Sequence, residues 1–249
     1  MKNIIKNNFD KASTTYNTQD NVQRKAASDL VQAMTNTCLD FSPDTILDIG
    51  CGTGNLIEEL YRIFPRSTYH INDISPSMIE QTVKRFKGVI QLNTHPGCIE
   101  EINLEHHYDL VISNMCFQWL ADLPAVIDDL LNRTNLLVFS CMVRDSFKEW
   151  YTLLEESNIQ HASRLYPSQE EICDIVHTLN QNILHTSQKT STLSFCNAKE
   201  AAHYLKEIGA NAPQYSIRTP NKVINFLRDN TTDCILRYNI GFFIIEGRL

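Results

Sequence analysis

Hydrophobic residues along the middle of the chain follow two alternating spacings. Short apolar runs of strand length predict β-strands at Thr45–Ile49, Thr68–Asn72, Val89–Leu92, Tyr108–Ser113 and Leu136–Met142. Amphipathic runs with apolar residues three and four positions apart predict helices between them, at Asn55–Phe64, Pro76–Phe86 and Pro124–Leu131. Regular alternation of strands and helices is typical of an α/β fold with a parallel, doubly wound sheet and right-handed crossovers.

The segments on either side of this core follow helical spacing for much of their length. Residues 1–40 place Phe9, Ala27 and Leu30 on one apolar stripe, which predicts helices that pack on the sheet. Tyr16 and Gln23 put polar groups on the same stripe, so they are candidates to contact an enclosed polar ligand. After residue 142 we expect helices at Ser146–Glu156, Gln169–Leu179, Ala198–Ile208 and Asn221–Arg228, and extended structure at Ile183–Phe195 and Cys234–Glu246.

A glycine-rich loop follows the first predicted strand. Asp44–Asn55 reads D-T-I-L-D-I-G-C-G-T-G-N, and it holds three of the eight glycines of the chain within five positions. Glycines so spaced between a strand and a helix allow a tight turn and a close approach of another molecule to the backbone. The spacing is G-x-G-x-G, with Asp48 two positions before the first glycine. This segment resembles motif I of the class I S-adenosylmethionine-dependent methyltransferases, in which the loop wraps the methionine end of the cofactor.

A second acidic residue, Asp73, follows the next predicted strand. A carboxylate at this position can accept hydrogen bonds from both ribose hydroxyls of a nucleoside. Ser75-Pro76 then reads as a helix cap followed by proline at the first helical position. Ligands of such sheets bind beyond the carboxyl ends of the strands. We therefore expect the glycine loop, Asp73, residues 97–99 and Ser113-Asn114 to converge on one cleft.

Composition narrows the class of protein further. The 249 residues, of which 43% are hydrophobic, can bury the core of one α/β domain. The eight cysteines form no C-x-x-C pair, which favours reduced thiols over a disulfide framework or a metal site. A net charge of −7 disfavours nucleic acid as a partner. The absence of an apolar run of membrane-spanning length and the polar N-terminus predict a soluble, cytoplasmic protein.

Six further motifs extend the resemblance over nearly the whole chain. They are F-x-x-A-x-x-x-Y at Phe9–Tyr16, V-Q-R at Val22–Arg24, D-I-S-P-S-M at Asp73–Met78, S-N-x-x-x-Q-W-L at Ser113–Leu120, H-A-S-R-L at His161–Leu165 and L-K-E-I-G-A-N at Leu205–Asn211. Together they resemble the malonyl-[acyl-carrier protein] O-methyltransferases of biotin synthesis. The resemblance implies a Rossmann-like fold with a seven-stranded, mostly parallel sheet, helices on both faces, and N-terminal helices and a helical insertion over the cleft. It also implies a single domain with a helical cover (1–40), a cofactor-binding core (44–142) and substrate-side elements (143–249).

The implied reaction transfers a methyl group from S-adenosylmethionine to the free carboxylate of malonyl-acyl-carrier protein, and the methyl ester then primes pimeloyl and biotin synthesis. A carboxyl group with an ordinary pKa near 4 is ionised at neutral pH, so no general base is needed. The residues that the resemblance offers for holding the substrate are Tyr16, Gln23, Arg24, Gln118, Trp119, Arg144, Arg164 and Lys206. Arg164 ranks first, because its guanidinium can bind a carboxylate through two parallel hydrogen bonds.

For the cofactor, the resemblance implies contacts from residues of four loops. These are Asp48, Gly50, Cys51, Gly52, Gly54, Asp73, Ile74, Cys98, Ile99 and Asn114. Asp48 is expected to hold the methionine ammonium, Asp73 the ribose, and Cys98 and Ile99 the adenine. Relatives usually carry aspartate where this chain has Cys98, and the candidates to replace it are Glu100 or the backbone alone.

Three other functions stay open on the sequence alone. The same fold is used by the complex I assembly factor that hydroxylates a protein arginine, by carboxyl methyltransferases of small free acids, and by proteins that bind the cofactor without catalysis. An acidic carrier protein would need a local basic patch, for which the candidates are Arg24, Lys25, Lys84, Arg85 and Lys87. No metal site is expected.

Overall fold

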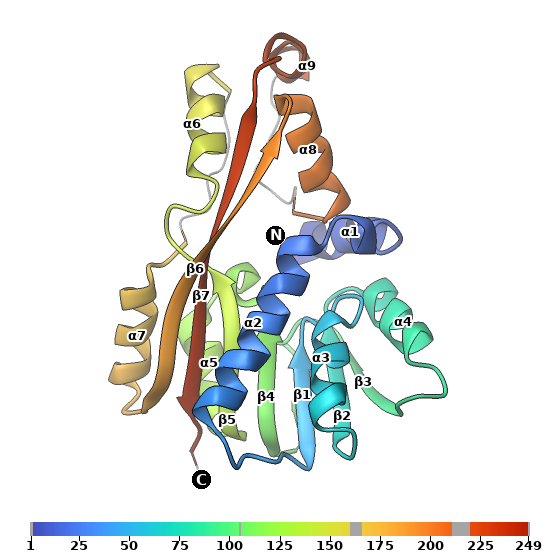
Figure 1. The fold of residues 1–249 in the computed structure, drawn as a ribbon, viewed down its shortest axis with the longest axis vertical. Helices are drawn as coiled ribbons and strands as arrows, with labels where there is room; N and C mark the ends of the chain where they lie inside the picture. Colours follow the sequence, from blue (N-terminus) through green and yellow to red (C-terminus); the bar gives the residue numbers. More distant parts are fainter. Residues whose placement is uncertain (1, 105, 160–165, 211–219, 249) are drawn as a thin grey trace.

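A computed structural model describes residues 2–104, 106–159, 166–210 and 220–248. Its strands form one sheet in the order β3-β2-β1-β4-β5-β7-β6 (Figure 1). The strands are β1 (Thr45–Ile49), β2 (Thr68–Asp73), β3 (Leu92–Pro96), β4 (Tyr108–Asn114), β5 (Thr134–Met142), β6 (Ile183–Phe195) and β7 (Cys234–Glu246). Strands β1 to β5 pair in parallel, and β7 runs antiparallel to both β5 and β6. The seven-stranded, mostly parallel sheet is therefore confirmed.

The described helices cover both faces and one end of this sheet (Figure 1). They are α1 (Lys2–Ala12), α2 (Asn21–Thr37), α3 (Asn55–Ile63), α4 (Pro76–Arg85), α5 (Leu123–Leu131), α6 (Lys148–Glu156), α7 (Gln169–Thr178), α8 (Ala198–Glu207) and α9 (Pro220–Asp229). Two short 3₁₀ turns, η1 (Tyr16–Thr18) and η2 (Phe117–Trp119), lie in the connections. No helix within the described ranges combines the length and the apolar character that crossing a membrane requires.

The central strands are hydrophobic on both faces because each face is covered. In β4, Leu110 and Ile112 belong to the core that contains α2 and α3, whereas Val111 belongs to the core on the opposite face, under α5 and α7. A parallel sheet covered in this way reads as continuous apolar runs, which explains why β1, β4 and β5 were predictable from sequence.

The long antiparallel pair of β6 and β7 extends beyond the rest of the sheet, and α6, α8 and α9 lie around its far end (Figure 1). Trp150 of α6 packs edge-on against Phe226 of α9, with ring centroids 5.9 Å apart. Leu205 of α8 and Leu236 of β7 are fully buried in the same cluster. The apolar residues at this end of the molecule therefore belong to the same core as those around α2.

One predicted strand is wrong. We expected Val89–Leu92, but β3 spans Leu92–Pro96. Val89 and Ile90 lie in the turn that ends α4, where both backbone N–H groups donate to the carbonyl of Phe86, and Val89 is 56% exposed. The true strand is a polar edge strand whose register is fixed by pairing with β2, and pairing with a neighbour leaves no periodic signal in the sequence. The other predicted elements agree with the structure to within two residues at either end.

Candidate functional site

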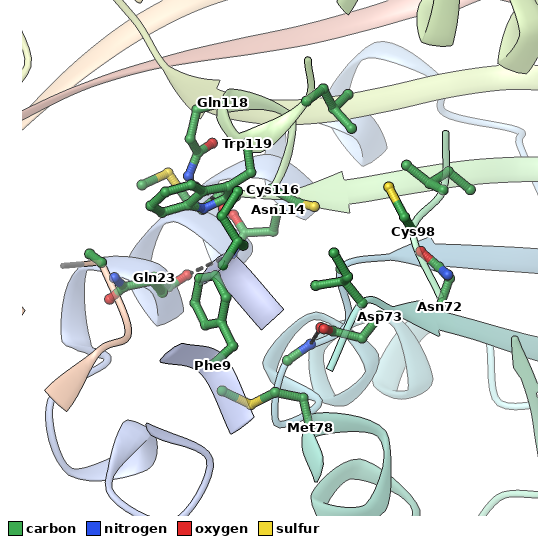
Figure 2. Close-up of a pocket in the computed structure, with 18 of the residues that line it drawn as sticks. Phe9, Gln23, Asn72, Asp73, Met78, Cys98, Asn114, Cys116, Gln118 and Trp119 are labelled. Carbon is green, nitrogen blue, oxygen red and sulfur yellow. Dashed lines mark hydrogen bonds between the residues drawn. The ribbon is translucent and has the colours of Figure 1, made fainter. Parts of the chain in front are cut away.

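A pocket opens at the carboxyl ends of the parallel strands, beneath α1 (Figure 2). The predicted loops that meet on its wall contribute Gly50, Gly52, Asp73, Ile74, Gly97, Cys98, Ile99 and Asn114. In Figure 2, Asp73, Asn72 and Cys98 lie on one side of the pocket, and Gln23, Gln118 and Trp119 lie on the other. The predicted convergence of the strand ends on one cleft is confirmed.

The glycine loop has a backbone that side chains would disturb. Gly50, Gly52 and Gly54 have φ angles of +70°, +53° and +86°, a region that residues with a Cβ rarely adopt. A Cβ on Gly50 would lie 2.4 Å from Sγ of Cys116, whereas one on Gly52 would meet no heavy atom within 4 Å. The backbone at Gly52 is thus open for the close approach of a ligand. Gly54 does not line the pocket; it precedes α3 and packs against Phe86.

Asp73 forms a hydrogen bond to this loop and also lines the pocket. Oδ2 accepts a hydrogen bond from the backbone N–H of Gly52 at 3.0 Å, and Oδ1 accepts one from Ser75 N–H at 2.8 Å. Burial raises the pKa of this carboxyl to about 6, and the two backbone donors act in the opposite direction. Each oxygen keeps a further acceptor site, so the carboxylate can also take hydrogen bonds from a ligand.

Asp48 is the most unusual acid near the loop. It is 1% exposed, and neither carboxylate oxygen has a hydrogen-bond partner within the described structure. Burial and the neighbouring charge of Asp73 raise its pKa well above the ordinary value. A buried, unpaired carboxyl group is costly, and a cationic donor is the partner that would relieve that cost. Asp48 and Cys51 are not among the residues that line the pocket; they lie buried behind its wall.

The loop at residues 97–100 is tied to its surroundings by Glu100. Oε1 of Glu100 accepts hydrogen bonds from the backbone N–H groups of Ala121 and Asp122, at 3.0 and 3.1 Å. Oε2 lies 3.1 Å from Nζ of Lys2, at the start of α1. Both oxygens are thus already engaged, which counts against Glu100 as a replacement for the aspartate that Cys98 displaces. Its contacts instead hold α1 over the pocket.

The polar residues opposite Asp73 are held by backbone contacts. Asn114 donates from Nδ2 to the carbonyl oxygen of Gln23 at 3.0 Å and accepts from the Ser140 hydroxyl at 2.8 Å (Figure 2). Gln118 donates to the carbonyl of Met115 at 2.6 Å. The bond between Asn114 and Gln23 fixes the first turn of α2 against the end of β4. The Oε1 atoms of Gln23 and Gln118 are buried and have no partner within the described structure.

Comparison with known proteins identifies the family. Residues 47–135 match the family model described as a methyltransferase domain. Over 219 residues the chain is 30% identical to a malonyl-[acyl-carrier protein] O-methyltransferase of Bacillus cereus, covering 84% of this chain and 81% of that one. It is 31% identical over 222 residues to the protein of the same name from Bacillus anthracis, with the same coverage. The chain belongs to the malonyl-[acyl-carrier protein] O-methyltransferase family. The resemblance drawn from its motifs is confirmed, and so is the expectation of a methyltransferase.

Solved structures agree with the fold of this malonyl-[acyl-carrier protein] O-methyltransferase family member. A plantazolicin methyltransferase in complex with SAH is similar with a TM-score of 0.56 at 18% identity, over 96% of this chain and 90% of that one. The YcgJ protein from Bacillus subtilis is similar with a TM-score of 0.61 at 13% identity, over 89% and 99% of the two chains. At these identities the comparison supports the fold alone.

Several basic residues predicted to hold the substrate lie outside the pocket lining of this family member. Arg24 pairs with Asp20 at 2.8 Å, and Arg144 pairs with Glu171 at 2.5 Å on the surface. Lys206 is exposed on α8, whose opposite face is buried. Arg164 lies outside the described residues. A family motif identifies a segment of the chain. It does not show which side chains of that segment point into the pocket and which point to solvent.

Other lining residues were not singled out as site residues from the sequence. Helix α1 contributes Lys2, Ile5 and Phe9, and the later part of the chain contributes Phe147, Ile208, Ala210 and Tyr238. Phe9 packs edge-on against Trp119, with ring centroids 5.6 Å apart, so α1 and η2 close the pocket together. The sequence predicted that one face of α1 is apolar and buried. It did not predict that this face covers the pocket.

Proposed function

We propose that this protein methylates the free carboxylate of malonyl-acyl-carrier protein, with S-adenosylmethionine as the methyl donor. Family membership supports this reaction, since the relatives from Bacillus cereus and Bacillus anthracis carry its name. The observation that carries the proposal is the pocket itself. It joins an open glycine backbone and a ribose-type carboxylate at one end to uncharged polar and aromatic groups at the other.

The residues present fit the donor. S-adenosylmethionine supplies an electrophilic methyl group on a positively charged sulfur. The open backbone at Gly52 leaves room for its methionine end, and Asp48, whose unpartnered carboxyl group is buried behind this loop, is the acid that would hold the ammonium of that end. Asp73 retains acceptor sites for two ribose hydroxyls.

Four more expected cofactor residues take supporting positions in this proposal. Ile74, Cys98 and Ile99 line the wall beyond Asp73, where the adenine would lie, and Asn114 holds α2 against the opposite wall. Cys98 offers no strong acceptor for the adenine amino group, so that group would depend on backbone carbonyls.

The acceptor needs no base from the protein. Its carboxyl group, with an ordinary pKa near 4, arrives ionised at neutral pH. Burial raises the pKa of the Cys116 thiol beside the loop, so this side chain stays protonated and takes no part in proton transfer. The work left to the protein is to exclude water and to align the two reactants, and α1, Phe9 and Trp119 serve the first purpose.

Most residues of the basic patch expected to bind an acidic carrier protein already form ion pairs. Of the expected basic patch, Arg24 is paired with Asp20, Lys25 with Asp29 and Arg85 with Glu58. These ion pairs cancel most of the positive charge of the patch. The remaining two candidates, Lys84 and Lys87, are exposed at the end of α4 and stay candidates for the contact.

A labelled-methyl assay tests the proposal. The purified protein is mixed with methyl-labelled S-adenosylmethionine and, separately, malonyl-acyl-carrier protein, malonyl-coenzyme A or free malonate. We expect label on the carrier protein, and Asp73→Ala should abolish most of it by weakening cofactor binding at least tenfold. Label only on free malonate would replace the proposal with a small-acid methyltransferase. No label on any acceptor, with cofactor still bound, would indicate a binding protein.

A further inference from the structure

Two tyrosine hydroxyls meet beside the part of the pocket wall that β7 contributes. Tyr204 of α8 and Tyr238 of β7 are 5% and 1% exposed, and their hydroxyl oxygens lie 2.9 Å apart in a hydrogen bond. Tyr238 lines the pocket, and Phe147 packs edge-on against its ring at 4.6 Å. Its ring is therefore fixed on both sides. Tyr16, from η1, also lines the pocket.

A buried amide adjoins this pair. Gln23 of α2 is 6% exposed and lines the pocket, and its side-chain amide acts on the Tyr204 hydroxyl in the direction that lowers the pKa of that group, against the effect of burial. Its Oε1 atom is buried without a partner within the described structure. An unpartnered amide oxygen is rare in a finished core, because leaving it without water costs about 1–3 kcal/mol. The arrangement indicates a place built for a polar ligand.

This end of the pocket carries polar groups but little charge. Among the described lining residues, the one cationic side chain is Lys2, which is paired with Glu100 and Glu101 at the cofactor end. Burial raises the pKa of Tyr204 to about 12 and raises that of Tyr238 well above its usual range. Both tyrosines therefore keep their hydroxyl hydrogens at neutral pH and can act as donors.

The hydroxyl pair can present one hydrogen to a ligand. Either hydroxyl can be the donor within the pair. When Tyr204 donates to Tyr238, the hydrogen of Tyr238 is left for a third partner, and Tyr238 lines the pocket in which a ligand could be that partner. Such a chain of hydrogen bonds strengthens the last donor.

We propose that Tyr238 binds the carboxylate of the acceptor through its hydroxyl, and that Tyr204 positions that hydroxyl. The inference rests on the proposed function, because it assigns the acceptor end of the same pocket. It assigns a neutral donor to the carboxylate, whereas the arginine expected from the motifs, Arg164, lies outside the described residues. Tyr238 is the binding residue, and Tyr204 acts through it.

A neutral donor suits the charges of the reaction. A carboxylate oxygen forms a bond to the methyl carbon, the bond from that carbon to sulfur breaks, and its electron pair stays on sulfur. One negative and one positive charge disappear, and no proton moves. A fixed cation beside the carboxylate would stabilise the reactants more than the transition state, where the negative charge is already partly lost. A tyrosine hydroxyl orients the carboxylate with a smaller penalty of this kind.

The test compares carriers with and without the carboxylate. Binding of malonyl-acyl-carrier protein and acetyl-acyl-carrier protein is measured by calorimetry in the presence of S-adenosylhomocysteine, for wild type, Tyr238→Phe and Tyr204→Phe. Tyr61→Phe is the matched control, because Tyr61 is a partly buried tyrosine of α3 that packs on Tyr69 outside the pocket. We expect Tyr238→Phe to reduce the preference for the malonyl carrier about tenfold or more. Tyr204→Phe should reduce it less, and Tyr61→Phe not at all.

Three results would overturn the inference. The preference could be unchanged in Tyr238→Phe, the affinity for both carriers could fall equally, or the loss could appear in S-adenosylhomocysteine binding instead. Thermal unfolding of each variant checks the fold, and KM for the malonyl carrier should rise more than kcat falls. Wild type that neither prefers nor methylates the malonyl carrier would refute the proposed function, a result visible before any variant is compared.

Discussion

The cofactor affinity of this protein should fall as the pH drops through about 6, because Asp73 becomes protonated there. Burial raises the pKa of Asp73 to about 6, so the group is ionised at pH 7 and largely protonated at pH 5. The ionised carboxylate can accept hydrogen bonds from both ribose hydroxyls, whereas the protonated form turns one oxygen into a donor. Affinity is therefore present above the pKa and lost below it.

The magnitude follows from the protonated fraction. If only the protein with ionised Asp73 binds S-adenosylhomocysteine, protonation raises the apparent Kd. The factor is 1 + 10^(pKa − pH), where pKa is that of Asp73. With the pKa of Asp73 at about 6, the factor is about 1.1 at pH 7 and about 11 at pH 5. The affinity for S-adenosylhomocysteine should thus weaken about tenfold, or about 1.4 kcal/mol, over these two pH units.

Calorimetric titration at pH 5, 6 and 7 measures this change, and Asp73→Asn is its control. The variant should bind more weakly at pH 7 and lose most of the slope. His70 and His95 on β2 and β3 also have lowered pKa values, but neither lines the pocket, so their contribution is the slope left in the variant. Asp10, whose charge raises the pKa of Asp73, offers a second check, since Asp10→Asn should move the midpoint to lower pH. A slope in Asp73→Asn equal to that of wild type would refute the reasoning.

Two stability predictions follow from the packing of α1. Gly209 has a φ of +70°, and a Cβ there would lie 2.8 Å from the ring of Phe9, so Gly209→Ala should lower Tm more than Gly88→Ala. Gly88→Ala is the control, because Gly88 also has a positive φ, +78°, but no atom lies within 4 Å of a Cβ added there. This control should lose only the backbone cost of about 1–2 kcal/mol. Equal losses in the two variants would contradict the contact with Phe9. Ser75→Ala removes the cap of α4 and the hydrogen bond to Asp10 at 2.6 Å, and it should lower the free energy of unfolding by at least about 1 kcal/mol in denaturant titration. An unchanged midpoint would show that neither bond contributes.

The sequence by itself determined the parts of the protein that depend on local geometry. Three glycines in alternate positions permit the left-handed backbone that this loop adopts, and Asp73 at the end of a short apolar strand has to lie at the same edge of the sheet as the glycine loop. The buried parallel strands read as apolar runs because both of their faces are covered. Together with the family motifs, these features predicted the fold class, the methyltransferase family and the walls of the cleft.

Only the tertiary structure decided which residues complete the pocket. Strand β3 takes its register from β2 and carries no apolar pattern of its own. Arg24 and Arg144 lie in family motifs or beside them, yet they form ion pairs away from the pocket. Tyr204 and Tyr238 meet although 34 residues separate them. Contacts of this kind depend on how distant helices and strands pack, and a side chain's neighbours in sequence do not specify its neighbours across the core.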